Sequence, residues 1–159
     1  MVELVGNLWS FHKEGKWVTI TTNGTIKSNG ACVMGRGVAL DAARLYPNLP
    51  FLLGEKIKKK GLKVHCFSMT KLIAFPVKHQ WHQKADIELI RKSCIELKEV
   101  CNIIDSMEGS TQDIYLPRPG CGNGGLQWKI VKPILEEYLK SNKYKVVELY
   151  GKYLDSNNG

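Results

Sequence analysis

The sequence of 159 residues contains no apolar run near the roughly 18 to 20 residues that a helix needs to cross a membrane. It also lacks a C-x-x-C pair and a secretory leader, and its five cysteines are an odd number, which disfavours a disulfide framework or a zinc ribbon. We therefore expect a reduced, cytoplasmic protein that has no membrane partner. No linker or internal repeat divides the chain, so we expect a single domain over residues 1–152 and a flexible tail over residues 153–159.

Acidic residues are the scarcer charged class, because 15 Asp and Glu stand against 23 Lys and Arg, for a formal net charge of +8. That balance favours a polyanionic partner, either nucleic acid or a phosphorylated small molecule. The densest basic stretch, GEKIKKKGLK at residues 54–63, is interpreted either as a solvated helix face or as a contact to a phosphate backbone. We find no carboxylate cluster typical of a metal site, so neither a metal nor a cofactor is expected.

Apolar, β-branched runs alternate with helical patterns, which predicts an α/β layer fold. Strands are expected at residues 2–5, 17–22, 62–67, 71–76, 113–117 and 144–150, and helices at 36–47, 51–61, 85–104 and 128–140. Pro133 predicts that the last regular helix begins only a residue or two before it. In the longest helix, apolar residues recur at steps of three and four and predict one stripe buried against the sheet. That stripe consists of Ile87, Ile90, Cys94, Leu97, Cys101 and Ile104.

Two glycine-bearing segments each follow an expected strand and precede an expected helix: TTNGTIKSNGACVMGRGVAL at residues 21–40 and LPRPGCGNGGLQW at residues 116–128. Such a turn directs backbone N–H groups and a helix N-terminus at a phosphate, provided that no side chain blocks the approach. Neither segment has the Lys-Ser/Thr ending of a P-loop or a complete dinucleotide fingerprint. Each loop alone also fits a tight turn. If their strands are neighbours, both loops face one cleft, which indicates a diphosphate ligand similar to ADP-ribose.

Four motifs occur in the order found in macro domains, the ADP-ribose-binding fold: GNLW, TTNG…NGACVMGRGVAL, AFPVKHQW and LPRPGCGNGGLQW. The resemblance covers essentially the whole chain. Within the macro domains, the motifs are most similar to those of the branch that contains DNA ADP-ribosyl glycohydrolases and terminal ADP-ribose glycohydrolases. It implies a three-layer α/β/α fold with a mixed central sheet of about six strands. It also implies a phage or bacterial protein that is a monomer. The expected partner is ADP-ribose or an ADP-ribosylated macromolecule, single-stranded DNA included.

The resemblance also implies which residues contact the ligand. Asn7 stands where macro domains usually have an aspartate that accepts a hydrogen bond from the adenine amine, and Leu8 supplies the neighbouring backbone amide. Asn23 matches the asparagine that faces the ribose, and Asn29 is a second candidate from the same loop. All three asparagines also fit turn or cap positions, and the thiol of Cys121 fits core packing better than nucleophilic catalysis. The remaining ligand contacts are assigned to Val33, Met34, Gly35, Arg36, Gly37 and Val38 in the first loop and to Gly120, Cys121, Gly122, Asn123 and Gly124 in the second.

The resemblance places catalysis in AFPVKHQW, residues 74–81, where Lys78 matches the catalytic lysine of the DNA glycohydrolase branch. A neutral amine attacks the anomeric carbon, whereas an ammonium group protonates the leaving group. His79 is a second candidate, for proton transfer, but it shares a site with Lys78 only if the strand has ended, since adjacent strand residues point to opposite faces. Gly124 stands where terminal ADP-ribose glycohydrolases have an aspartate, which moves the resemblance toward the DNA-directed branch.

Three functions are therefore in competition. The first is an ADP-ribosyl glycohydrolase that removes ADP-ribose from a macromolecule, with a DNA base as the favoured attachment site. The second is a non-catalytic module that binds or sequesters ADP-ribose-like nucleotides. The third is a phosphatase that acts on ADP-ribose-1''-phosphate. Pocket residues alone fit all three, and the role of Lys78 distinguishes the first from the second.

Overall fold

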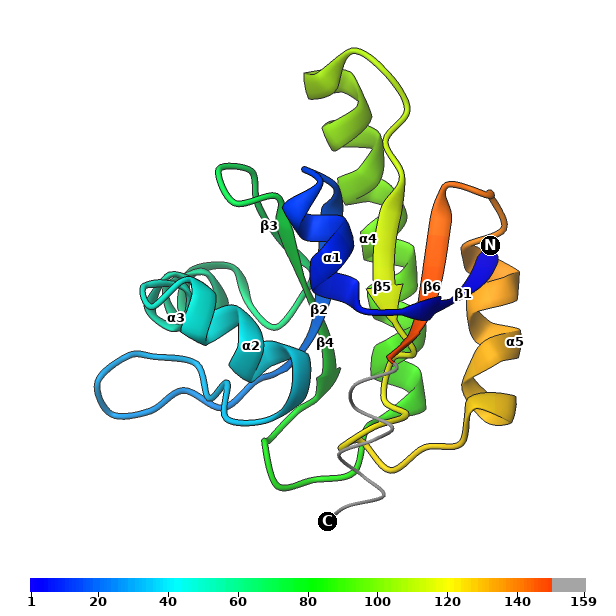
Figure 1. Ribbon diagram of the computed structural model, residues 1–159. Coiled ribbons are helices and arrows are strands. Elements are labelled where there is room, and N and C mark those ends of the chain that lie inside the picture. Colours follow the sequence, from blue (N-terminus) through cyan, green and yellow to red (C-terminus); the bar gives the residue numbers. More distant parts are fainter. Residues whose placement is uncertain (150–159) are drawn as a thin grey trace.

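The computed structural model describes residues 1–149, so the tail expected at residues 153–159 and the last residue of the strand expected at 144–150 lie outside the described residues. Within this part of the chain, six strands form one sheet in the order β1-β6-β5-β2-β4-β3, and helices cover both of its faces (Figure 1). All strand pairs are parallel except β3 with β4. The predicted three-layer fold with a mixed sheet is confirmed.

The strands are β1 (Val2–Gly6), β2 (Trp17–Asn23), β3 (His65–Phe67), β4 (Leu72–Lys78), β5 (Ile114–Pro117) and β6 (Tyr144–Leu149). The helices are α1 (Leu8–Lys13), α2 (Gly37–Leu45), α3 (Leu49–Lys60), α4 (Ile87–Glu108) and α5 (Trp128–Tyr138). None of these described helices is both long and apolar enough to cross a membrane.

Two apolar cores lie on opposite faces of the sheet, because successive side chains of a strand point in opposite directions. In β4, Ile73 and Phe75 pack in the core shared with α4 and α5, whereas Leu72 and Ala74 pack in the core shared with α1, α2 and α3. All four side chains are fully buried. Burial on both faces explains why β4 appears in the sequence as a continuous apolar run, whereas β2 mixes apolar residues with β-branched threonines.

The predicted stripe of the longest helix is confirmed by its burial. Within α4 the side chains facing the sheet are fully buried, except for the first, which is half-buried. The helix continues beyond the predicted end to Glu108 and stops at Gly109, whose φ of 75° ends the helix in the left-handed conformation. The stripe consists of Ile87, Ile90, Cys94, Leu97, Cys101 and Ile104.

Two elements differ from the prediction because they are short. The sequence pattern did not indicate α1, whose six residues are too few to show a helical period and which buries only Leu8 completely. The strand expected at residues 62–67 is shorter, since β3 pairs with β4 only through His65, Cys66 and Phe67.

The predicted start of the last helix is wrong. α5 begins at Trp128, so Pro133 lies in its second turn instead of close to its first residue. A proline at this position has no N–H for the carbonyl of Lys129, four residues earlier. Both residues are exposed, so water can pair with that carbonyl and the helix continues.

The end of β4 departs from regular pairing, and this departure determines where Lys78 lies. Thr22 of β2 pairs with Pro76 of β4, but the next pair joins Asn23 to Lys78, so Val77 is an extra residue on β4. A bulge of this kind re-aims the side chains that follow it. Val77 and Lys78 consequently both line the cleft described below.

Pro76 is unusual in an inner strand because it cannot donate to a neighbouring strand. It is accommodated here because the pairing of β3 with β4 ends at Ala74, before the proline is reached. The buried carbonyl of Pro76 accepts a hydrogen bond of 2.8 Å from Oγ of Ser93, which is itself fully buried in α4. This bond fixes the last part of β4 against the longest helix.

We expect Ser93→Ala to lower the free energy of unfolding by about 1–3 kcal/mol, because it removes the donor to a buried carbonyl. Ser106→Ala, an exposed position on the same helix, should change this free energy by about 0.5 kcal/mol or less. Urea denaturation of both variants measures the difference. Equal stabilities of the two variants would show that the Ser93 bond does not hold β4.

Candidate functional site

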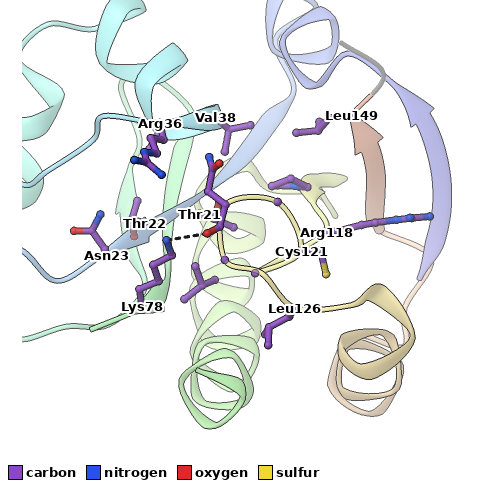
Figure 2. A pocket seen from close by; sticks show the side chains of 18 of the residues that line it. Thr21, Thr22, Asn23, Arg36, Val38, Lys78, Arg118, Cys121, Leu126 and Leu149 are labelled. Carbon is purple, nitrogen blue, oxygen red and sulfur yellow. Dashed lines mark hydrogen bonds between the residues drawn. The ribbon is translucent and has the colours of Figure 1, made fainter. Parts of the chain in front are cut away.

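A cleft of about 930 Å³ opens where β2, β4, β5 and β6 end. These strands are parallel neighbours, so their carboxyl ends and the glycine-bearing loops after β2 and β5 lie at one edge of the sheet (Figure 2). Most of the residues predicted to contact a ligand line this cleft. They are Asn23, Val33, Met34, Gly35, Arg36, Gly37, Val38, Lys78, Gly120, Cys121, Gly122, Asn123 and Gly124.

The first loop is shaped by the side chain of Asn23. Its Nδ2 donates to the Val33 carbonyl at 2.9 Å, and its Oδ1 accepts from the Thr25 amide at 3.0 Å. The chain then enters α2, whose N-cap residue Arg36 makes no side-chain capping hydrogen bond. The first N–H groups of α2 therefore face the cleft without a side-chain partner, an arrangement that favours an anion.

The second loop closes on itself through two glycines. A Cβ atom on Gly124 would lie 2.4 Å from the carbonyl oxygen of Gly120, and Gly120 has a φ of 74°. The Gly120 carbonyl accepts from the Leu126 amide at 2.9 Å, and the Gly124 carbonyl accepts from the Ala85 amide at 2.9 Å. These two glycines are thus required by the packing of the loop itself, whereas Gly35 in the first loop has open space around it.

Lys78 extends from the end of β4 toward the second loop (Figure 2). Its Nζ donates to the carbonyl of Asn123 at 3.1 Å and to the carbonyl of Trp81 at 3.3 Å. Burial, and then the positive charge of Arg36, lower the pKa of the Lys78 amine. The lowered pKa makes the neutral, nucleophilic amine easier to reach than in an ordinary exposed lysine, while the two carbonyl acceptors stabilise the ammonium form.

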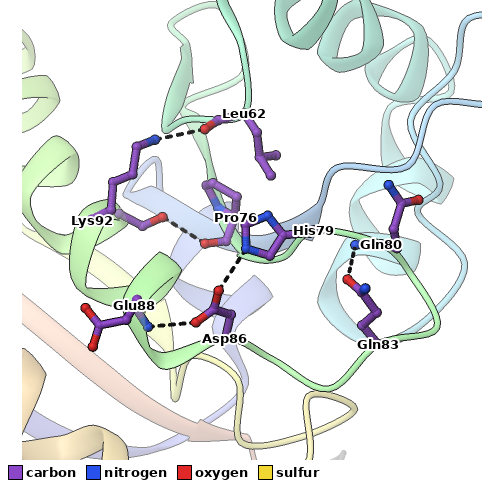
Figure 3. A network of polar contacts seen from close by, with 9 residues as sticks. Leu62, Pro76, His79, Gln80, Gln83, Asp86, Glu88 and Lys92 are labelled. Carbon is purple, nitrogen blue, oxygen red and sulfur yellow. Dashed lines mark hydrogen bonds and ion pairs between the residues drawn. The ribbon is translucent and has the colours of Figure 1, made fainter.

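His79, the second predicted catalytic residue, does not line the cleft. Its Nε2 lies 2.8 Å from Oδ2 of Asp86 (Figure 3), and this contact is the largest cause that lowers the pKa of the Asp86 carboxyl. Asp86 in turn caps α4 by accepting from the Glu88 amide at 2.9 Å. Since β4 ends at Lys78, the two neighbouring residues point to different sites, and His79 is not used in the function proposed below.

Three residues predicted to bind the ligand also lie outside the cleft lining. The Oδ1 of Asn7 accepts from the Trp9 amide at 2.9 Å and caps α1, while Leu8, the first residue of that helix, is buried. Asn29 is exposed, and its Oδ1 accepts from the Ala31 amide at 3.0 Å. Local hydrogen bonds to the backbone thus use the acceptor oxygens that the sequence had assigned to a nucleotide.

The far end of the cleft contains residues that were not predicted to contact a ligand. Trp128 is a wall of the cleft, and its Nε1 donates to Oε1 of Glu3 at 2.9 Å. The guanidinium group of Arg118 lies 4.9 Å from the centre of the Trp128 ring and 3.4 Å from Oε2 of Glu148. Arg118 stands within the second glycine segment, but a single arginine between two prolines has no pattern that separates ligand binding from structure. Among the described residues, no group of three or more His, Cys, Asp or Glu side chains could hold a metal ion.

Comparison with known proteins decides the family. No family model matches the chain. The chain is 30% identical over 146 residues to a DNA ADP-ribosyl glycohydrolase of Thermus aquaticus, an alignment that covers 86% of this chain and 37% of the relative. The macrodomain of Mycobacterium tuberculosis DarG superposes with a TM-score of 0.67 at 23% identity, over 84% of this chain and 88% of that one. The chain is a macro domain.

This macro domain is most similar to the branch that contains DarG and the DNA ADP-ribosyl glycohydrolases, as the resemblance predicted. A structure of Thermosipho africanus DarTG in complex with ADP-ribose superposes with a TM-score of 0.64 at 24% identity, over 84% of this chain and 38% of that one. The macro domain therefore spans little more than a third of the length of the Thermus and Thermosipho proteins.

Gly124→Ala is expected to lower the free energy of unfolding by about 1–3 kcal/mol, because the new Cβ would overpack the closed second loop. Gly35→Ala, in the same cleft but in open space, should change it by about 0.5 kcal/mol or less. Chemical denaturation of the two variants measures this difference in the free energy of unfolding. A Gly124→Ala variant as stable as the wild type would mean that the loop relaxes without cost.

Proposed function

We propose that the macro domain binds ADP-ribose in this cleft, with the diphosphate between the two glycine-bearing loops. The observation that carries the proposal is that both loops and the N-terminus of α2 open into one cleft that has Lys78 at one end. The diphosphate would receive backbone N–H groups from the first loop, where Gly35 leaves open space for its approach. The ADP-ribose complex of the structural neighbour supports this assignment.

The orientation of the ligand follows from the two ends of the cleft. Lys78 and Asn23 lie together at one end, while Val38 and Leu149 lie at the other (Figure 2). Polar groups at the first end suit the hydroxyls of the distal ribose, and the apolar side chains at the second end suit the adenine ring. The distal anomeric carbon is thereby placed near Lys78.

The proposed reaction is hydrolysis of the glycosidic bond that joins ADP-ribose to a DNA base. Neutral Nζ of Lys78 attacks the anomeric carbon, the bond to the base breaks, and its electron pair goes to the departing base, which takes up the proton lost by the amine. Water then attacks the anomeric carbon, its proton passes to Nζ, and the C–N bond breaks with its electron pair on Nζ, which restores neutral Lys78 and releases ADP-ribose. The lowered pKa of Lys78 supports the attacking role.

Gly124 supports DNA as the macromolecule from which ADP-ribose is removed. An aspartate at this position, as the resemblance implies for terminal ADP-ribose glycohydrolases, would bring its Cβ to 2.4 Å from the Gly120 carbonyl oxygen. The acid is therefore excluded by the local packing as well as by the sequence. The name of the Thermus relative, a DNA ADP-ribosyl glycohydrolase, points to the same substrate class.

Lys78→Ala should reduce the release of ADP-ribose at least about a hundredfold, because it removes the reacting amine. The substrate is single-stranded DNA that carries ADP-ribosylated thymidine or guanosine, and products are followed by chromatography with mass detection. Calorimetry should show that the variant still binds ADP-ribose, and Lys60→Ala, an exposed lysine of α3, serves as the active control. Intact DNA with wild type that binds ADP-ribose would favour the non-catalytic module, and inorganic phosphate from ADP-ribose-1''-phosphate would favour the phosphatase.

The pH dependence of kcat/KM separates the two chemical roles of Lys78. If the neutral amine attacks, kcat/KM should rise with pH until the pH passes the pKa of Lys78, which burial holds below its ordinary value. If the ammonium group protonates the leaving base, kcat/KM should instead fall as the pH rises through that pKa. A falling profile would thus contradict the nucleophilic mechanism while leaving glycohydrolase activity intact.

A further inference from the structure

A second, smaller hollow of about 300 Å³ adjoins the cleft on the other side of Lys78. The two spaces are in contact, since Lys78, Arg36 and Asn123 line both of them. If ADP-ribose fills the main cleft and its anomeric carbon faces Lys78, the group attached to that carbon must leave it on the far side. The hollow adjoins the cleft at Lys78 and is therefore placed to receive that group.

The side chains around the hollow are basic. Arg36, Lys78 and Lys84 contribute cationic groups, and His82 contributes an imidazole. Among the described residues that line the hollow, none is acidic. A polyanion would therefore meet no repelling carboxylate there, whereas a cationic or neutral partner would gain nothing from this arrangement.

An aromatic ring stands at the junction of the two spaces. Trp81 lines both, and 48% of its surface is exposed. Its backbone is held on both sides, because its amide donates to Oγ1 of Thr25 at 2.9 Å and its carbonyl accepts from Nζ of Lys78 at 3.3 Å. An exposed indole on a backbone held in this way is a surface on which a nucleobase can stack.

The chain around Trp81 is further ordered by its own hydrogen bonds. Oε1 of Gln83 accepts from the Gln80 amide at 2.9 Å (Figure 3), and the Gln80 carbonyl accepts from the Gln83 amide at 3.1 Å. Oγ1 of Thr25 also donates to Oε1 of Gln80 at 2.7 Å. The wall of the hollow is thus a closed turn tied to the first loop, with Lys84 following it along Gly125 of the second loop.

We propose that this hollow binds the phosphodiester next to the modified nucleotide of a single-stranded nucleic acid, with Lys84 and Arg36 at the phosphate and Trp81 stacked on a flanking base. The inference rests on the proposed function, because it assigns the hollow to the strand from which ADP-ribose is removed. It also assigns recognition of the nucleic acid to the basic residues of the hollow instead of to the lysines of α3.

Binding of an unmodified single-stranded oligothymidylate, measured by fluorescence anisotropy, tests the hollow without relying on catalysis. Lys84→Glu should weaken this binding about tenfold or more and lower the slope of its salt dependence by about one or more. Trp81→Ala should weaken it about fivefold. Lys60→Glu makes the same charge change on α3 and should weaken binding by less than about threefold. Thermal melting confirms that each variant is folded.

Calorimetry with ADP-ribose, run on the same proteins, separates the two spaces. Lys84→Glu should bind ADP-ribose within about twofold of the wild type, and saturating ADP-ribose should leave oligothymidylate binding in place, because the two ligands occupy different hollows. Failure of the wild type to bind ADP-ribose would contradict the proposed function, while the oligothymidylate series would still decide what the hollow binds.

Four results would overturn the inference. An equal loss of binding in Lys60→Glu and Lys84→Glu would assign the strand to α3. Oligothymidylate displaced by ADP-ribose would show that the strand lies in the main cleft. A wild type that binds ADP-ribose but no oligothymidylate, or that binds an ADP-ribosylated peptide more tightly than ADP-ribosylated DNA, would exclude a nucleic-acid site.

Discussion

Parallel pairing of β2 with β4 and with β5 is the constraint on which the site depends. It brings the carboxyl ends of three strands to one edge, so two loops that are about 90 residues apart in the chain face each other. The extra residue Val77 then places Lys78 between those loops. Without that bulge the Lys78 side chain would follow the regular alternation of the strand and point to the other face. The Asn123 carbonyl of the second loop would then lose its hydrogen bond from Nζ of Lys78.

The layer order and most of the elements follow from the sequence because they depend on long apolar patterns. The stripe that includes Cys94 and Cys101 and the doubly buried runs of β2 and β4 are visible without a structure. The short helix α1 and the position of Pro133 within α5 are not visible, because one is shorter than two helical turns and the other depends on which face of the helix meets water. The glycine loops were recognised from composition. That they face one cleft depended on whether their strands are neighbours, and the strand order of the structure shows that β2 and β5 are.

Individual polar contacts were harder to predict than the cleft itself. Asn7 and Asn29 have the side chains that a nucleotide needs, yet each is bonded to the backbone two residues ahead. His79 stands beside Lys78 in the sequence and is bonded to Asp86 in the structure. Sequence shows which groups are available, but burial and the local backbone decide which of them remain available to a ligand. Trp81 and Arg118 show the converse, since both stand within the macro-domain motifs but neither was predicted to contact the ligand, and both line the cleft.

The self-closure of the second loop also affects the thermodynamics of any ligand that enters the cleft. A loop that must order itself around a ligand loses conformational entropy at that moment, and the observed affinity is reduced accordingly. Here the Gly120 and Gly124 carbonyls are already bonded to the Leu126 and Ala85 amides before a ligand arrives. The ordering cost of this wall is therefore met during folding, and contacts made in the cleft contribute to affinity with little entropic loss from this loop.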